Sequence, residues 1–319
     1  MGRRLTGLVL ASGLLALGAL RAAERQFDLA GHVYPEGRAS ITLFGATTPF
    51  TASTTSDSHG RFRFRRLAEG TYTVAVFVPG GGEARQTIEV GPSFADAKGH
   101  VALTLELRTA QLNPQALQKR HLVSARELSI PARARREYQE AQKSLSRRDA
   151  AGAVAHLEKA VAIAPQFATA WNNLGTIAYQ SREFARAEQN FRKALEQDSQ
   201  AFEPLVNLGG ALLSEGKFPE ALPYNRDAVE ARPRDALANS QLGLNYFALG
   251  DFDRAEKYLI TAQQIDPAHF SEPQLTLAEI YIRENKPRAA ALELEDFLRR
   301  HPDATNAAEI RKTIEKLKK

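Results

Sequence analysis

Two histidines and one glutamate in the last third of the sequence have the residue types and spacing of metal ligands. His269 and Glu272 form a His-x-x-Glu pair, and His301 could supply a third ligand. Imidazole nitrogens and carboxylate oxygens are groups that Zn²⁺ accepts in proteins. This two-ligand spacing is weak evidence alone, and all three residues fall in or beside predicted loops. We therefore expect no metal site and no cofactor.

The motifs of common catalytic sites are absent from the sequence. The chain has no cysteine, which excludes disulfide bonds, thiol catalysis and thiolate metal sites. It also has no Gly-x-Ser-x-Gly motif, no His-Glu-x-x-His motif and no dinucleotide-binding glycine pattern. We expect a protein that is not an enzyme and that acts through the shape of its surface.

A short pattern recurs along most of the chain at intervals of 34, 34, 34 and 35 residues. Small residues in the middle of predicted helices would let two helices cross closely, and proline would end the second helix of each pair. A period of this length is typical of stacked helical hairpins. The three ladders in register are Ala141, Gly175, Gly209, Gly243 and Ala278; Ala153, Ala187, Ala221, Ala255 and Ala290; and Pro165, Ser199, Pro233, Pro267 and Pro302.

Two repeats carry a longer motif: Trp171-x-x-Leu174-Gly175 with Ala187-x-x-x-Phe191, and Leu242-Gly243-x-x-Tyr246 with Ala255-x-x-x-Leu259. On these residues, the segment 132–303 resembles the tetratricopeptide repeat family. The resemblance implies about five helical hairpins stacked into a solenoid, and residues 304–319 are expected to form a capping helix with a polar outer face.

Residues 25–108 contain short alternating apolar runs separated by turn residues, a pattern that predicts half-buried strands. Seven strands in about 80 residues favour a β-sandwich. The predicted strands are Phe27–Tyr34, Ser40–Phe44, Phe50–Thr54, Arg61–Arg65, Thr71–Val78, Ala84–Val90 and His100–Leu107.

The segment from Asp57 to Val74 is similar to the carboxypeptidase regulatory-like domain, a transthyretin-type sandwich. Gly60 closes a hairpin turn, and Phe62 and Phe64 point to one face. The resemblance implies the fold and little about activity, because this family is an accessory module of secreted and envelope proteins. The expected fold class is a multidomain α and β protein, a seven-stranded β-sandwich followed by a tetratricopeptide solenoid.

The first 23 residues have the pattern of a signal peptide. Arg3 and Arg4 precede an uncharged stretch of 16 residues from Leu5 to Leu20, and small residues follow Arg21. That stretch is shorter than the roughly 20 residues of a spanning helix. We expect this segment to be cleaved, so the mature protein would be periplasmic or secreted. An uncleaved N-terminal anchor is the alternative. Residues 109–131 are expected to be a linker.

Positive and negative charges are balanced within each predicted domain. Residues 24–108 carry nine basic and nine acidic groups, and residues 132–319 carry 27 of each. Without a large cationic surface, binding of nucleic acid is not expected.

The resemblance implies a concave groove lined by the first helix of each repeat, which in this family holds a peptide or a partner's helix. We therefore predict an exported protein-interaction scaffold. Three alternatives stay open: a carbohydrate-binding envelope protein that uses the β-sandwich, an enzyme whose site matches none of the common motifs, and a groove whose apolar residues pack on neighbouring repeats. The predicted groove residues are Tyr138, Gln142, Asn172, Thr176, Tyr179, Val206, Leu213, Leu244, Phe247, Leu275, Glu279 and Ile282.

Overall fold

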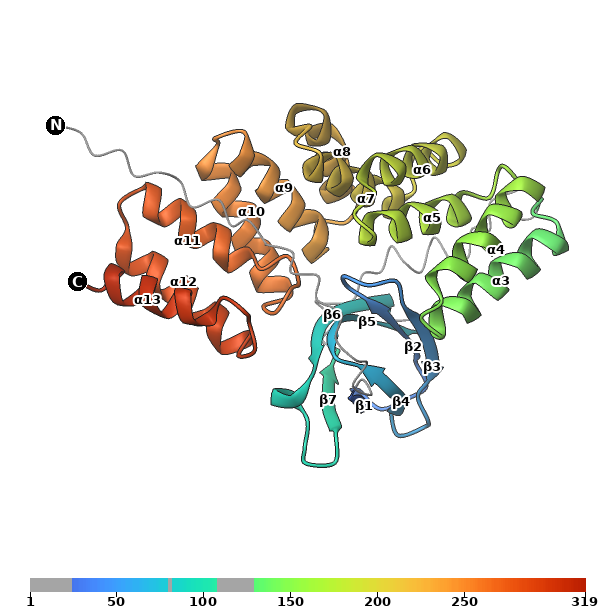
Figure 1. The fold of residues 1–319 in the computed structure, drawn as a ribbon, viewed down its shortest axis with the longest axis horizontal. Helices are drawn as coiled ribbons and strands as arrows, with labels where there is room; N and C mark the ends of the chain where they lie inside the picture. The colour runs from blue at the N-terminus through green and yellow to red at the C-terminus, as the bar shows by residue number, and fades with distance from the viewer. Residues whose placement is uncertain (1–24, 80–81, 108–128) are drawn as a thin grey trace, which may run out of the picture.

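The computed structural model describes residues 25–79, 82–107 and 129–319. The predicted signal peptide (1–23) and all but the end of the predicted linker (109–131) lie outside the described residues. Figure 1 shows a β domain placed inside a curved array of helices, with the C-terminal helix at one end of the curve.

Seven strands form the β domain, as predicted, and they assemble into two sheets. One sheet has the order β4-β1-β7, and the other has the order β3-β2-β5-β6. All neighbours are antiparallel except β1 and β7. The strands are β1 Gln26–Tyr34, β2 Ser40–Gly45, β3 Thr51–Thr55, β4 Arg61–Ala68, β5 Gly70–Val78, β6 Gly82–Val90 and β7 His100–Glu106.

The core of the sandwich comes from the alternation of side chains along each strand. Phe62 and Phe64 on β4 are buried, and Tyr72 and Val74 on β5 continue the same core. The arginines that alternate with these phenylalanines, Arg61, Arg63 and Arg65, face outward, where Arg63 pairs with an aspartate on β1. The outward face of the second sheet stays available for contact with the helices.

Eleven helices follow in the described part of the chain, as five hairpins and one final helix. The hairpins are α3 Ala132–Ser146 with α4 Ala150–Ile163, α5 Ala168–Gln180 with α6 Phe184–Gln197, α7 Phe202–Ser214 with α8 Phe218–Ala231, α9 Ala236–Ala248 with α10 Phe252–Ile265, and α11 Pro273–Arg283 with α12 Pro287–Arg300. The final helix, α13 Ala307–Leu317, buries Ile310 and Ile314 against the last hairpin, so the predicted capping helix is confirmed.

The small residues of the first ladder lie where the two helices of a hairpin cross. A Cβ atom on Gly175 would lie 2.4 Å from the ring of Phe191, and one on Gly209 would lie 1.9 Å from Asn225. Such separations do not occur between real atoms, so a larger side chain would force the helices apart. The alanines of the second ladder are fully buried. The predicted helical register is confirmed.

Candidate functional site

The outward face of the four-stranded sheet carries mainly small hydroxyl side chains. Thr42 and Ser53 on this face share a 3.0 Å hydrogen bond between their hydroxyl groups. The sheet therefore offers a flat polar surface rather than an apolar one. Strand register places Ser53, Thr42, Ala75 and Arg85 in one row, and Thr51, Phe44, Thr73 and Thr87 in the next.

The first two repeats contact this domain through Arg148 and Gln180. Arg148 lies in the turn between α3 and α4 with a left-handed φ of 61°. Its guanidinium donates a 2.5 Å hydrogen bond to the Tyr72 hydroxyl and lies 4.9 Å from the centre of the Phe50 ring. The side-chain amide of Gln180 donates to the carbonyl of Gly45 at 3.0 Å. These contacts hold the β3 and β2 side of the sheet.

The last two repeats hold the opposite edge of the same sheet, near β6. The backbone N–H of Thr87 donates to the Asp266 carboxylate at 2.8 Å, so a side chain covers part of an edge strand that could otherwise pair with another chain. His301 contacts Glu89 on the same strand. Burial raises the pKa of Asp266, and the contacts with Thr87 only partly offset that effect.

The three residues considered as metal ligands lie at this second contact. His269 is buried, and its Nδ1 atom lies 2.6 Å from the Ser271 hydroxyl. Burial lowers the pKa of His269 to about 3 and raises that of Glu272. Across the described ranges, no group of three or more His, Cys, Asp or Glu side chains is placed to hold a metal ion. His301 instead joins the array to the β domain.

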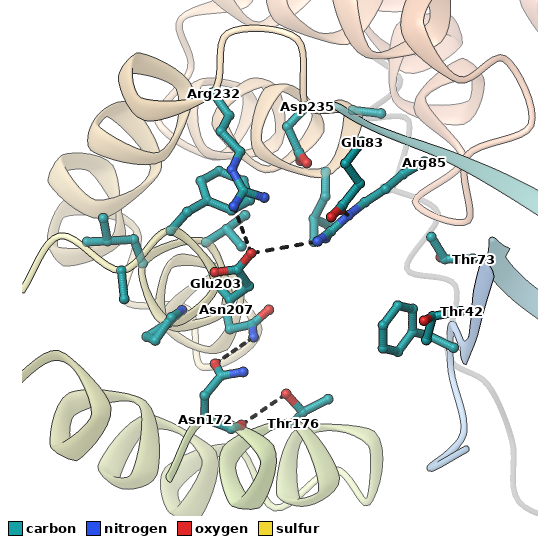
Figure 2. A pocket seen from close by; sticks show the side chains of 18 of the residues that line it. Thr42, Thr73, Glu83, Arg85, Asn172, Thr176, Glu203, Asn207, Arg232 and Asp235 are labelled. Atoms are coloured by element: carbon teal, nitrogen blue, oxygen red, sulfur yellow. Dashed lines mark hydrogen bonds and ion pairs between the residues drawn. The ribbon is translucent and has the colours of Figure 1, made fainter. Parts of the chain in front are cut away.

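Between the two contacts, the sheet and the array enclose a cavity of about 2210 Å³. Pockets for small molecules usually have about 300–1,000 Å³, so this space suits a larger ligand. In Figure 2, Thr42 and Thr73 lie on one wall, and Asn172, Thr176 and Asn207 lie on the other. The cavity therefore has one wall from each domain.

Side-chain amides form a row on the helical wall. Asn173, Asn207 and Gln241 follow each other at intervals of 34 residues, and all three line the cavity. The amide nitrogen of Asn207 donates to the side-chain oxygen of Asn172 at 3.0 Å, and that of Asn173 donates to the Tyr138 hydroxyl at 3.1 Å. Amides both donate and accept hydrogen bonds, so the row can bind peptide groups.

A group of charged residues links the two walls on one side of the cavity. Glu203 on α7 accepts from Arg232 at 2.9 Å and lies 3.6 Å from Arg85 on β6, as Figure 2 shows. Burial opposes the ionisation of Glu203, but Arg232 and Arg85 lower its pKa below the ordinary value. Arg85 also contacts Glu83 at 2.6 Å. The two arginines in this group are thus neutralised by carboxylates of the protein.

The predicted groove residues fall into two groups. Tyr138, Gln142, Asn172, Thr176, Tyr179 and Val206 line the cavity. The other six, Leu213, Leu244, Phe247, Leu275, Glu279 and Ile282, are not part of its lining.

Most residues of the second group contact other residues of the array. Leu244 and Phe247 pack in the cluster that contains Leu259, and Glu279 pairs with Arg283 at 2.7 Å. Arg283 also lies 5.1 Å from the centre of the Phe247 ring. These contacts agree with the alternative in which apolar groove positions pack on neighbouring repeats.

The amide row was not predicted from the sequence. Asn172 and Gln142 were among the predicted groove residues, whereas Asn173, Asn207 and Gln241 were not. Their spacing of 34 residues is the signal that could have identified them. The residues that join the domains, such as Arg148 and Asp266, have no comparable periodic signal.

Family comparisons agree with this architecture. The carboxypeptidase regulatory-like domain family matches residues 34–105. Two tetratricopeptide repeat families match the array, one at residues 138–202 and 173–236 and the other at residues 212–274 and 246–314. The chain belongs to the tetratricopeptide repeat proteins and carries an N-terminal carboxypeptidase regulatory-like domain. Scaffolds of this repeat family are generally non-enzymatic and bind protein partners.

Individual relatives share only part of this chain. The human and mouse proteins named cell division cycle protein 16 homolog are each 33% identical over 113 residues, which is 33% of this chain and 18% of theirs. This chain thus spans less than a fifth of their length.

Two solved structures of similar fold have a TM-score of 0.50 and 20% identity. Residues 41 to the end of MamA from Desulfovibrio magneticus RS-1 match 56% of this chain and 99% of that structure. PilW, described as a widely conserved type IV pilus biogenesis factor, matches 59% of this chain and 91% of that structure. At this level of identity the similarity establishes the fold alone.

Proposed function

We propose that this protein is a non-enzymatic scaffold that binds an extended polypeptide segment of a partner protein in the cavity between its two domains. The observation that carries this proposal is the amide row opposite the polar face of the sheet. Asn173, Asn207 and Gln241 repeat at the spacing of the solenoid, and they all line one cavity. A regular row of donors and acceptors matches the regular peptide groups of an extended chain.

The size of the cavity also supports a polypeptide. Its volume of about 2210 Å³ exceeds that of a usual small-molecule pocket. The tyrosines at its helical wall, Tyr138 and Tyr179, could contact side chains of the bound segment. Because residues from both domains form the walls, the β domain would be part of the binding site rather than a spacer.

Export of the protein is a second part of the proposal. It is supported by the basic start and the uncharged stretch from Leu5 to Leu20. Among the described residues, no helix combines the length and the apolarity needed to cross a bilayer. Cell fractionation with N-terminal sequencing of the mature protein tests this part. A cytoplasmic protein that retains Met1 would contradict it.

Carbohydrate binding through the β-sandwich is less well supported. One face of the sandwich forms a cavity wall, and the arginines on the β4 face pair with aspartates: Arg61 with Asp57 and Arg63 with Asp28. Within the described residues, we find no observation that favours a sugar over a peptide at either face.

Photo-crosslinking tests the site in cells that produce the protein. A benzophenone amino acid would replace Val206 on the helical wall, Thr42 on the sheet wall or Leu292 outside the cavity. We expect one partner to be crosslinked from both wall positions and not from Leu292, which is 65% exposed. In a paired Asn172→Ala and Asn207→Ala variant, both wall crosslinks should weaken. Equal crosslinking from all three positions would contradict the proposal.

A further inference from the structure

Gln241 presents an acceptor that lacks a partner within the described residues. Its side chain lines the cavity and the residue is only 9% exposed. No hydrogen bond from a described residue reaches its Oε1 atom. A Cβ atom on Gly210 would lie 2.4 Å from the Gln241 amide nitrogen, so the absence of a side chain there makes room for this amide. Because a buried acceptor without a donor is costly, Gln241 indicates a ligand that donates.

The mouth of the same cavity is acidic. Glu196 and Asp198 at the end of α6, and Asp227 and Glu230 near the end of α8, are all exposed residues of its lining. None of these four carboxylates forms an ion pair with another described residue. They are therefore available to cations from solution or from a bound partner.

The lining holds three arginines, Arg85, Arg232 and Arg234, against nine acidic residues. Two of the three, Arg85 and Arg232, already contact Glu203, and Arg85 also contacts Glu83. These pairs lie between the two walls, whereas the four carboxylates without an ion pair are exposed at the solvent side of the lining. The electrostatic field at the mouth thus favours positive side chains.

We infer that the cavity binds an extended peptide segment rich in lysine or arginine. This inference rests on the proposed function and adds the chemistry of the partner. Backbone N–H groups of the segment donate to Gln241 and to the neighbouring amides. Its basic side chains extend toward the mouth, where they pair with Asp227, Glu230 and the carboxylates at the end of α6.

Three matched peptides of nine residues test this inference with the full-length protein. Each peptide alternates serine with lysine, glutamate or glutamine and carries a fluorescent label, so that anisotropy gives its Kd. We expect the lysine peptide to bind about tenfold more tightly than the glutamine peptide and the glutamate peptide to bind least. Raising the salt concentration should reduce this preference because exposed charges are screened.

Two sets of variants separate the charge from the hydrogen bond. Asp227→Asn combined with Glu230→Gln should reduce the preference for lysine over glutamine to about threefold or less. Glu309→Gln combined with Glu315→Gln makes the same change in net charge on α13 and should leave the preference unchanged.

Gln241→Leu should raise the Kd of the lysine peptide and of the glutamine peptide by a similar factor of about five, because it removes an acceptor for the peptide backbone. Gln139→Leu on α3, at the matching position of the first repeat but outside the cavity lining, is the control. Unfolding transitions of both variants would show whether each is folded.

The outcomes distinguish the inference from the proposed function. If the glutamine or glutamate peptide binds as tightly as the lysine peptide and crosslinks at Val206, the basic preference is wrong while the cavity remains a peptide site. If no peptide of the three crosslinks at Val206 or Thr42, the inference is overturned, and the cellular crosslinking decides the proposed function separately.

Discussion

Equivalent positions in the early and late repeats have different surroundings. Thr176 in the second repeat and Leu244 in the fourth are separated by two periods of 34 residues. Thr176 lines the cavity, whereas Leu244 packs within the array. Tyr179 and Phe247 both contact an aromatic ring five residues further on, Phe184 and Phe252, but of the two only Tyr179 lines the cavity, and Phe247 also contacts Arg283. A repeat position thus defines the backbone, but the neighbouring elements decide whether its side chain packs or remains available.

The largest effect should come from charging the late positions. Leu244→Glu combined with Phe247→Glu places two carboxylates among the apolar side chains of the fourth repeat. We expect a loss of about 2–4 kcal/mol of unfolding free energy, from lost packing and the burial of charge. Urea unfolding measures this loss. Asn172→Ala, at a lining position, should change stability by less than about 1 kcal/mol. Similar losses in both variants would remove the distinction between packing and lining residues.

A helix-crossing position should show the next largest effect. Gly209→Leu inserts a side chain where even a Cβ atom would lie 1.9 Å from Asn225. We expect destabilisation of about 1–3 kcal/mol by overpacking, read from the thermal transition. Ala248→Leu at the exposed end of α9 adds the same side chain as a control. An unchanged transition for Gly209→Leu would show that the helical register is wrong.

The contact between the domains should contribute less than the array core. Arg148 and Arg182 occupy the same left-handed position in successive turns, with φ angles of 61° and 63°. Replacing either arginine by alanine should therefore change the conformational free energy of the backbone by a similar amount. Of the two, only Arg148 contacts Tyr72 and Phe50. We expect Arg148→Ala to lose about 1–2 kcal/mol more stability than Arg182→Ala.

Spin labels provide a direct readout of that contact. The absence of cysteine allows nitroxides to be attached at introduced cysteines, for example Ser58→Cys and Ser181→Cys. Arg148→Ala should broaden the distance distribution between the labels, and Arg182→Ala should not. Identical distributions would mean that Arg148 does not hold the β domain against the array.

The smallest predicted effect is on pH dependence. Burial raises the pKa of Asp266, so its protonated form is favoured when it is docked against Thr87. The stability that it contributes is present below the ordinary carboxyl pKa and is lost as pH rises through the raised value. Asp266→Asn keeps an oxygen that can accept from the Thr87 N–H and removes the titration.

Unfolding measurements at several pH values between about 4 and 8 test this prediction. The stability of Asp266→Asn relative to the unmodified protein should increase with pH. Subtracting the two curves removes the contributions of other groups, such as Asp296, whose pKa is lowered to about 2. A difference that stays constant, or that decreases with pH, would show that the carboxylate is not disfavoured in this contact.

The sequence was informative about features that repeat and uninformative about features that do not. Its 34-residue period predicted the helical hairpins and the crossings at Gly175 and Gly209. The groove residues followed from the family resemblance, and six of the twelve line the cavity. Alternating apolar residues likewise predicted all seven strands. Docking of the sandwich against the array depends on single contacts. Arg148 contacts Tyr72, 76 residues before it in the sequence, and Asp266 contacts Thr87, 179 residues before it. Contacts of this kind follow no period, so the second wall of the cavity was not foreseen.

The most direct test of the two-walled cavity uses the lysine-serine peptide with one photoreactive residue at its centre. Mass spectrometry of the crosslinked full-length protein would identify the residues that the peptide touches. We predict crosslinks to both walls, near Asn207 and Val206 on the array and near Thr42 and Thr73 on the sheet. Crosslinks confined to one domain, or concentrated near Leu292 outside the cavity, would contradict an enclosed binding site.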